Sequence, residues 1–130
     1  MTQERAVPFD DEQNDRCRNL EFAVLLRALL DAAWRESDIA HYKETPQNLS
    51  RKRACQTHRA AARGWLLSPA NREHVEAIAE RAGLPEGAIW SLVERFVRGA
   101  EDPAPLRQIY DRLMHRPGSF RLGPDVAFVA

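Results

Sequence analysis

Residues 76–93 read EAIAERAGLPEGAIWSLV, and this stretch has the spacing of a helix-turn-helix. Ala79 is a small residue in mid-helix, where a second helix has to approach closely. Four residues later, Gly83 can adopt the left-handed conformation that ends a helix, and Leu84 follows as the apolar plug of the turn. The stretch therefore predicts two packed helices in the middle of the chain. The inner face of the second helix is formed by Ile89 and Leu92.

The whole chain has the length and composition of one helical domain. It has 130 residues and a formal net charge of zero, which argues against a surface built entirely for nucleic acid. The charges are nevertheless uneven. Residues 1–15 hold five acidic residues and one basic residue, whereas residues 41–72 hold seven Lys and Arg against Glu44 alone. A basic segment of this kind can bind phosphate even in a neutral chain.

Apolar periodicity and capping signals predict an all-α fold of about five helices, with the helix-turn-helix-like pair at its centre. We expect a flexible acidic arm at residues 1–16, a helical domain at 17–116 and an extended C-terminal tail at 117–130. Ser50 is the expected N-cap of the second helix. Ser68-Pro69, Pro85 and Asp102-Pro103 are the expected starts of the next three. The helices are expected at residues 18–36, 50–67, 69–82, 85–98 and 103–115.

The first helix is apolar around most of its circumference, and only Arg27, Asp31 and Arg35 form a clear polar stripe. Such a wide apolar surface needs to be covered on more than one side. Two interpretations remain open: the segment from Leu20 to Trp34 is a central core helix, or it is the surface through which the chain forms a homo-oligomer.

The second helix carries a basic stripe. Lys52, Gln56, Arg59 and Arg63 follow one another at i, i+4, i+7 and i+11, opposite the expected inner face. Each cation that neutralises a phosphate releases a counterion, so the stripe predicts salt-sensitive binding to double-stranded DNA. The candidate DNA-binding residues are Arg51, Lys52, Arg53, Gln56, Arg59 and Arg63.

The helix that would read bases has the wrong chemistry for that task. Its first turn offers Glu86, which phosphates repel, and Arg95 and Arg98 come late in the helix. Trp90 occupies an outward position where a base-reading side chain usually lies. The pair is therefore either a purely structural unit or part of a protein that contacts DNA through backbone phosphates.

The pattern AARGWLLS at residues 61–68, followed by a helix and by AGLP at residues 82–85, resembles the small helical proteins of tailed phages, prophages and gene transfer agents. The resemblance covers residues 61–97 and implies a role in DNA packaging or regulation, with a small terminase subunit as its most concrete form. It further implies that Lys52, Arg59 and Arg63 face DNA, that residues 20–34 assemble an oligomer, and that residues 120–130 meet a protein partner.

The alternative function is a helical protein-interaction module or adaptor without nucleic-acid binding. An outward Trp more often packs on another helix or on a partner than on DNA, and an apolar tail can dock on a partner as an extended peptide. The candidate partner-binding residues are Trp90, Phe120, Leu122 and Phe128.

No pattern in the sequence indicates catalysis. It has no Gly-rich phosphate loop, no nucleophile motif and no His-Glu metal pair, so we expect neither an enzyme nor a cofactor. Cys17 and Cys55 stand alone, without the ligand spacing of a zinc site, and two free thiols are typical of the cytoplasm. No apolar run reaches membrane-spanning length, and we expect no interaction with a membrane.

Overall fold

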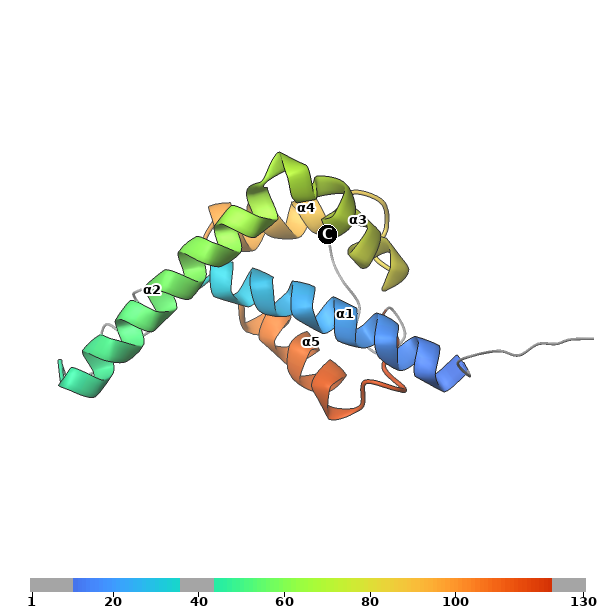
Figure 1. Cartoon of the computed structure of the whole chain (residues 1–130), viewed down its shortest axis with the longest axis horizontal. Coiled ribbons are helices and arrows are strands. Elements are labelled where there is room, and N and C mark those ends of the chain that lie inside the picture. The colour runs from blue at the N-terminus through green and yellow to red at the C-terminus, as the bar shows by residue number, and fades with distance from the viewer. Residues whose placement is uncertain (1–10, 36–43, 123–130) are drawn as a thin grey trace, which may run out of the picture.

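The computed structural model describes residues 11–35 and 44–122, and within these ranges all the regular elements are helical, with no strand. The predicted all-α fold is therefore confirmed (Figure 1). The elements are α1 (Asp11–Ala32), α2 (Pro46–Leu67), the 3-10 turn η2 (Pro69–Asn71), α3 (Arg72–Arg81), α4 (Ala88–Leu92), the π-helical segment η3 (Val93–Arg98) and α5 (Ala104–His115).

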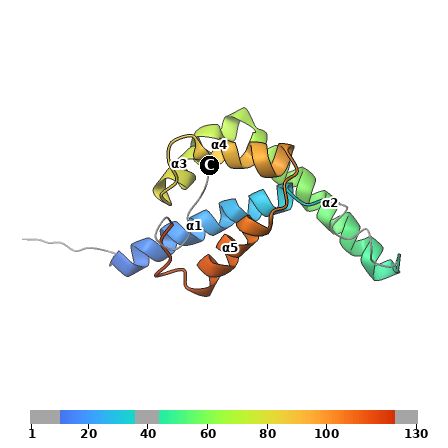
Figure 2. The ribbon, with the colours of Figure 1, turned by 180° about the vertical axis from the view of Figure 1, so that it is seen from behind.

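Helix α1 is the central helix of the core. It contacts α2, α3, α5 and η3, and Figures 1 and 2 show it between α5 on one side and the α3–α4 layer on the other. Burying one large apolar side chain contributes about 1.5–3 kcal/mol, so the inner face of α1 is a major source of stability. Its fully buried side chains are Phe22, Leu25, Leu26, Leu29 and Ala32.

The start of α1 differs from the expectation. The helix begins at Asp11 and ends at Ala32, so residues 11–16 belong to it and not to a flexible arm. Asp15 explains part of this difference, because its carboxylate pairs with Arg18 one turn later (3.2 Å) and with Arg121 near the other end of the chain. Acidic residues near a helix N-terminus also interact favourably with the helix dipole. Residues 1–10 lie outside the described ranges.

The N-cap predicted at Ser50 is wrong. Helix α2 begins one turn earlier, because Thr45 accepts a hydrogen bond from the amide of Asn48 (3.2 Å) and Pro46 occupies the first helical position. Ser50 lies inside the helix. The segment between the first two helices therefore ends at Thr45, and residues 36–43 lie outside the described ranges.

The central helix pair has the predicted turn but a later second helix. Gly83 has a φ of +107° where α3 ends, and Leu84 is buried beneath the turn. Pro85 does not open the second helix. Gly87, with a φ of +77°, is its N-cap, and α4 begins at Ala88. The turn is longer than expected because two left-handed glycines, rather than one, reverse the chain.

Segment η3 continues α4 as a π-helix and ends in close backbone packing. The amide of Gly99 donates to the carbonyl of Glu94, five residues earlier (2.7 Å). A Cβ added at Gly99 would lie 2.8 Å from the carbonyl oxygens of both Glu94 and Arg95. Backbone atoms at that distance have to move, so only glycine fits the end of η3 without strain.

Gly99→Ala is expected to lower the free energy of unfolding by about 1–2 kcal/mol, because of this clash. Gly64→Ala is the matched control. Gly64 lies within α2, and an added Cβ there has no neighbour within 4 Å. The control should raise stability by about 0.5–1 kcal/mol through helix propensity. Urea denaturation of the two variants measures the change in the free energy of unfolding for each. Equal changes would contradict the steric explanation.

The bounds of α5 agree closely with those predicted from the sequence. Asp102 accepts a hydrogen bond from the amide of Ala104 (3.0 Å), and α5 ends at His115 as expected. The amphipathic pattern is confirmed because the apolar stripe faces the core. The buried residues of α5 are Leu106, Ile109 and Leu113.

Candidate nucleic-acid interface

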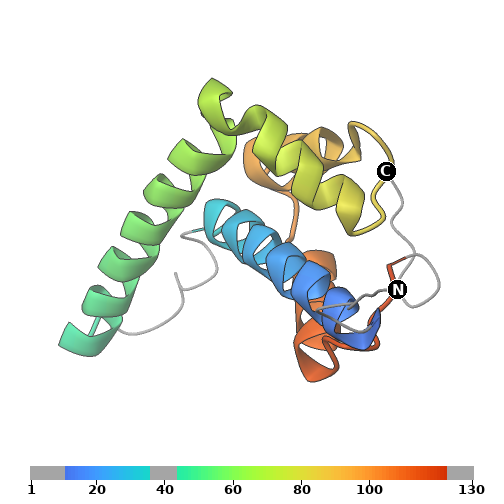
Figure 3. The same cartoon turned by 45° about the vertical axis from the view of Figure 1, so that its right-hand side comes forward.

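Helix α2 holds all six candidate DNA-binding residues and has an unusual charge. It contains five Lys and Arg side chains and no Asp or Glu over its 22 residues. Its N-terminal half, residues 46–57, has no buried residue. Figures 1 and 3 show this half extending away from the other described helices. At 1.5 Å per residue, the projecting half of α2 (residues 46–57) is about 18 Å long.

The candidate residues are not equally accessible. Arg51, Arg53 and Gln56 are exposed, and Arg59 is half-buried. Lys52 is half-buried and engaged in an interaction within the chain. The cations of α2 that are exposed to phosphate are thus Arg51 and Arg53, which flank the predicted stripe, and Arg59 remains partly accessible.

Arg63 does not belong to an outward stripe, and this is a correction to the expectation. Its Nε donates to the carbonyl of Ala32 and its Nη2 to the carbonyl of Val97, both at 3.0 Å. Burial lowers the pKa of its guanidinium, and the nearby charge of Arg59 lowers it further. The side chain thus links α2 to the last residue of α1 and to the end of η3.

The exposed surface of the α4–η3 helix offers few groups to a base edge. Arg95 is bound to Glu101 (3.0 Å) and Arg98 to Glu94 (3.2 Å), so each cation already has a carboxylate partner. Glu86 lies exposed just before the helix. These charges are poorly suited to entering a groove of DNA, where direct readout depends on donors from Arg, Asn or Gln.

Trp90 is engaged within the helix pair. Its ring packs against the core, and its indole Nε1 donates to Glu76 on α3 (2.6 Å). The guanidinium of Arg72 lies 4.5 Å from the centre of the ring. The indole N–H and one face of the ring are therefore already satisfied, as is usual for a half-buried Trp.

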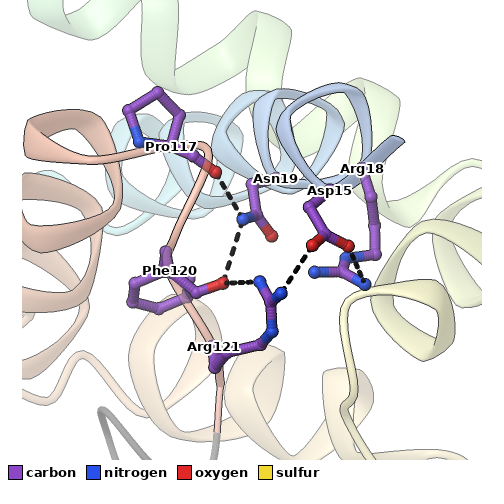
Figure 4. A network of polar contacts seen from close by, with 6 residues as sticks. All are labelled: Asp15, Arg18, Asn19, Pro117, Phe120 and Arg121. Atoms are coloured by element: carbon purple, nitrogen blue, oxygen red, sulfur yellow. Dashed lines mark hydrogen bonds and ion pairs between the residues drawn. The ribbon is translucent and has the colours of Figure 1, made fainter. Parts of the chain in front are cut away.

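The described start of the tail, residues 117–122, is fastened to α1. Asn19, only 2% exposed, donates from its Nδ2 to the carbonyls of Pro117 (2.6 Å) and Phe120 (3.0 Å), as Figure 4 shows. Phe120 was expected on a partner, but its ring is 4% exposed and lies in the core. Leu122 packs against the same core. Phe128 lies outside the described ranges.

Part of the apolar surface of α1 stays exposed, in a groove whose walls the sequence did not show. An open groove of about 610 Å³ lies between α1, α2 and α5. Val24 is 64% exposed and Leu20 41% exposed along it, and α5 adds the exposed Met114. The signal was present in the sequence, since Leu20 and Val24 lie one turn apart on the face that carries Arg27 and Asp31. We call this surface, with its α2 wall of His58, Ala61, Ala62 and Trp65, the α1–α2–α5 groove.

No family model matches the chain. Neither a curated protein nor a solved structure matches it. Within residues 11–35 and 44–122, none of the helices is long and apolar enough to cross a membrane. The same residues bring no three His, Cys, Asp or Glu side chains together as metal ligands. The functional inference therefore depends on the projecting half of α2.

Proposed function

We propose that this protein is a non-enzymatic DNA-associated protein that binds the phosphate backbone of duplex DNA through the projecting half of α2. One observation carries the proposal: α2 is a helix with five basic residues and no acidic ones, and half of it has no buried residue. The charges of such a helix repel one another. A polyanion neutralises them, and the counterions that its phosphates release favour the binding.

The contacts come from a short segment of α2. Arg51 and Arg53 are exposed, and Arg59 lies about two turns further along the helix, on the way to the body of the domain. A guanidinium can bind a phosphate through two parallel N–H donors, which makes Arg a suitable side chain for this contact. Gln56 lies between them and can add a neutral hydrogen bond. Arg63 takes no part, because both of its contacts are internal.

The binding is proposed to be insensitive to base sequence. The α3–α4 pair has the outline of a helix-turn-helix, but its exposed charges are paired and Trp90 is bound to Glu76. Contacts to phosphate position a protein on DNA without reading it. The resemblance of residues 61–97 to small phage proteins adds the biological setting, in which such a protein serves DNA packaging or regulation.

The alternative of an adaptor that uses Trp90 and the tail receives less support. The indole N–H has an internal partner, and the ring of Phe120 is buried in the core. The indole N–H of Trp90 and the ring of Phe120 therefore offer little to another protein, whereas an exposed phosphate-binding helix has no such internal partner for Arg51 and Arg53 among the hydrogen bonds and ion pairs described.

The test is binding to a fluorescent duplex across a salt series, with the variant Arg51→Gln/Arg53→Gln/Arg59→Gln. If three phosphates are contacted, the log Kd of the wild type should rise with the logarithm of the salt concentration, with a slope of about 3. The slope for the variant should be near zero. At low salt the variant should bind at least about tenfold more weakly, since it has lost all three charge-assisted contacts. Two duplexes of unrelated sequence should give the same affinity.

The matched control is Arg16→Gln/Arg112→Gln/Arg116→Gln, which changes the net charge by the same amount at three exposed positions on α1, α5 and just after α5. It should keep the wild-type slope. The proposal is overturned if the wild type fails to bind at low salt, or if the control loses as much affinity as the α2 variant, because net charge alone would then explain binding.

A further inference from the structure

The two exposed arginines of the projecting half of α2 lie on opposite sides of the helix. Arg51 and Arg53 are two residues apart, so at 3.6 residues per turn they leave the helix about 160° apart around its axis. Residues 46–57 include no buried residue, and Figure 3 shows them extending away from the other described helices. Both cations can therefore meet phosphates at once where phosphates lie on both sides of α2.

The grooves of a nucleic-acid duplex present phosphates in that arrangement, because a different strand borders each side of a groove. A helix that lies across a single strand has phosphates on one side only. An α-helix with its side chains is about 10–12 Å wide. The major groove of B-form DNA is about 12 Å wide and admits a helix, whereas the minor groove is only about 6 Å wide. The major groove of A-form RNA is too deep and narrow for a helix.

We propose that the projecting half of α2 lies in the major groove of B-form DNA, with Arg51 on the phosphates of one strand and Arg53 on those of the other. The placement rests on the proposed function, because α2 has to bind a duplex before it can occupy a groove. It makes the protein selective for double-stranded DNA over double-stranded RNA without any reading of bases. The phosphates of the two duplexes carry the same charge, and the width of the groove decides between them.

The first experiment compares duplexes of one sequence by fluorescence titration with the full chain. In one DNA duplex every cytosine carries a 5-hydroxymethyl group, and in a second, glucose is attached to that group. The C5 position of a pyrimidine faces the major groove, so the glucose obstructs this groove and leaves the phosphate charge unchanged. The glucose should raise Kd at least about tenfold, because a helix outside the groove keeps only one of the two arginine contacts. Double-stranded RNA of the same sequence should bind as weakly as the glucosylated duplex.

The second experiment measures the salt dependence of binding to unmodified DNA for three single variants. Arg51→Gln and Arg53→Gln should each lower the slope of log Kd against the logarithm of the salt concentration by about 1, since each removes one phosphate contact. Arg16→Gln, at an exposed position of α1, is the matched control and should keep the wild-type slope.

Three outcomes overturn the placement and leave the proposed function standing, provided that the wild type keeps a slope of about 3. The glucosylated duplex binds as tightly as its hydroxymethyl control, RNA binds as tightly as DNA, or only one of Arg51→Gln and Arg53→Gln changes the slope. A wild type that binds none of the duplexes at low salt overturns both the placement and the proposed function.

Discussion

Replacing Arg63 by methionine is expected to lower the free energy of unfolding by about 2–3 kcal/mol, because two charge-assisted hydrogen bonds are lost while the packing of the side chain is largely kept. The two acceptors are the carbonyl of Ala32, the last residue of α1, and that of Val97 near the end of η3. Carbonyls in the last turn of a helix lack partners within it, and a cation there also interacts well with the helix dipole.

The matched control is Arg59→Met, one turn earlier in α2. Burial and the charge of Arg59 both lower the pKa of Arg63, so removing Arg59 relieves a repulsion and should leave stability within about 0.5 kcal/mol of the wild type. Arg59→Met should instead weaken DNA binding. Urea denaturation and duplex titration of both variants check this. Equal stability losses would contradict the assignment of Arg63 to the fold and Arg59 to the phosphate contact.

Local signals were sufficient to predict the fold class and the position of α5. Asp102-Pro103 precedes the start of this helix and the apolar stripe marks its buried face, and both signals act within a few residues. The same holds for Gly83, whose left-handed conformation ends the first helix of the central pair. The start of α2 was predicted wrongly. Ser50 is a good N-cap residue, but the helix begins after Thr45, with Pro46 at its first position.

The candidate interface was only partly predictable, because periodicity assigns residues to a helix face but does not say what that face meets. Arg63 lies on the same stripe as Lys52 and Arg59, but it binds the last residue of α1 and the end of η3, and those contacts depend on tertiary packing. The groove could not be predicted for the same reason. Leu20 and Val24 look like core residues in a helix that is apolar all round, and only the positions of α2 and α5 show that they stay exposed.

The contacts of residues 117–120, at the described start of the tail, were not predicted because their partner is 98 to 101 residues away in the sequence. Asn19 lies among polar residues, after Arg18 and just before the apolar run of α1, so the sequence alone gives no reason to bury it. Its burial makes sense only beside the carbonyls of Pro117 and Phe120, because buried amides are nearly always hydrogen-bonded.

Replacing Asn19 by aspartate is therefore expected to be more damaging than replacing it by alanine. Asn19→Ala removes the donor to Pro117, while Phe120 keeps the bond from Arg121 (3.0 Å), and stability should fall by about 1–3 kcal/mol. Asn19→Asp keeps the shape but turns a carboxylate toward two carbonyl oxygens, so the loss should exceed about 3 kcal/mol.

Urea denaturation shows which of the two Asn19 variants is less stable. Amide hydrogen exchange at residues 117–122 shows where the structure loosens first. Asn14→Ala is the control, since Asn14 is exposed on the same helix and its loss should change stability by less than about 0.5 kcal/mol. If aspartate is no worse than alanine, the two carbonyls do not converge on Asn19. Phe120 would then be held by apolar packing alone, and the tail would be free to leave the core as the sequence first suggested.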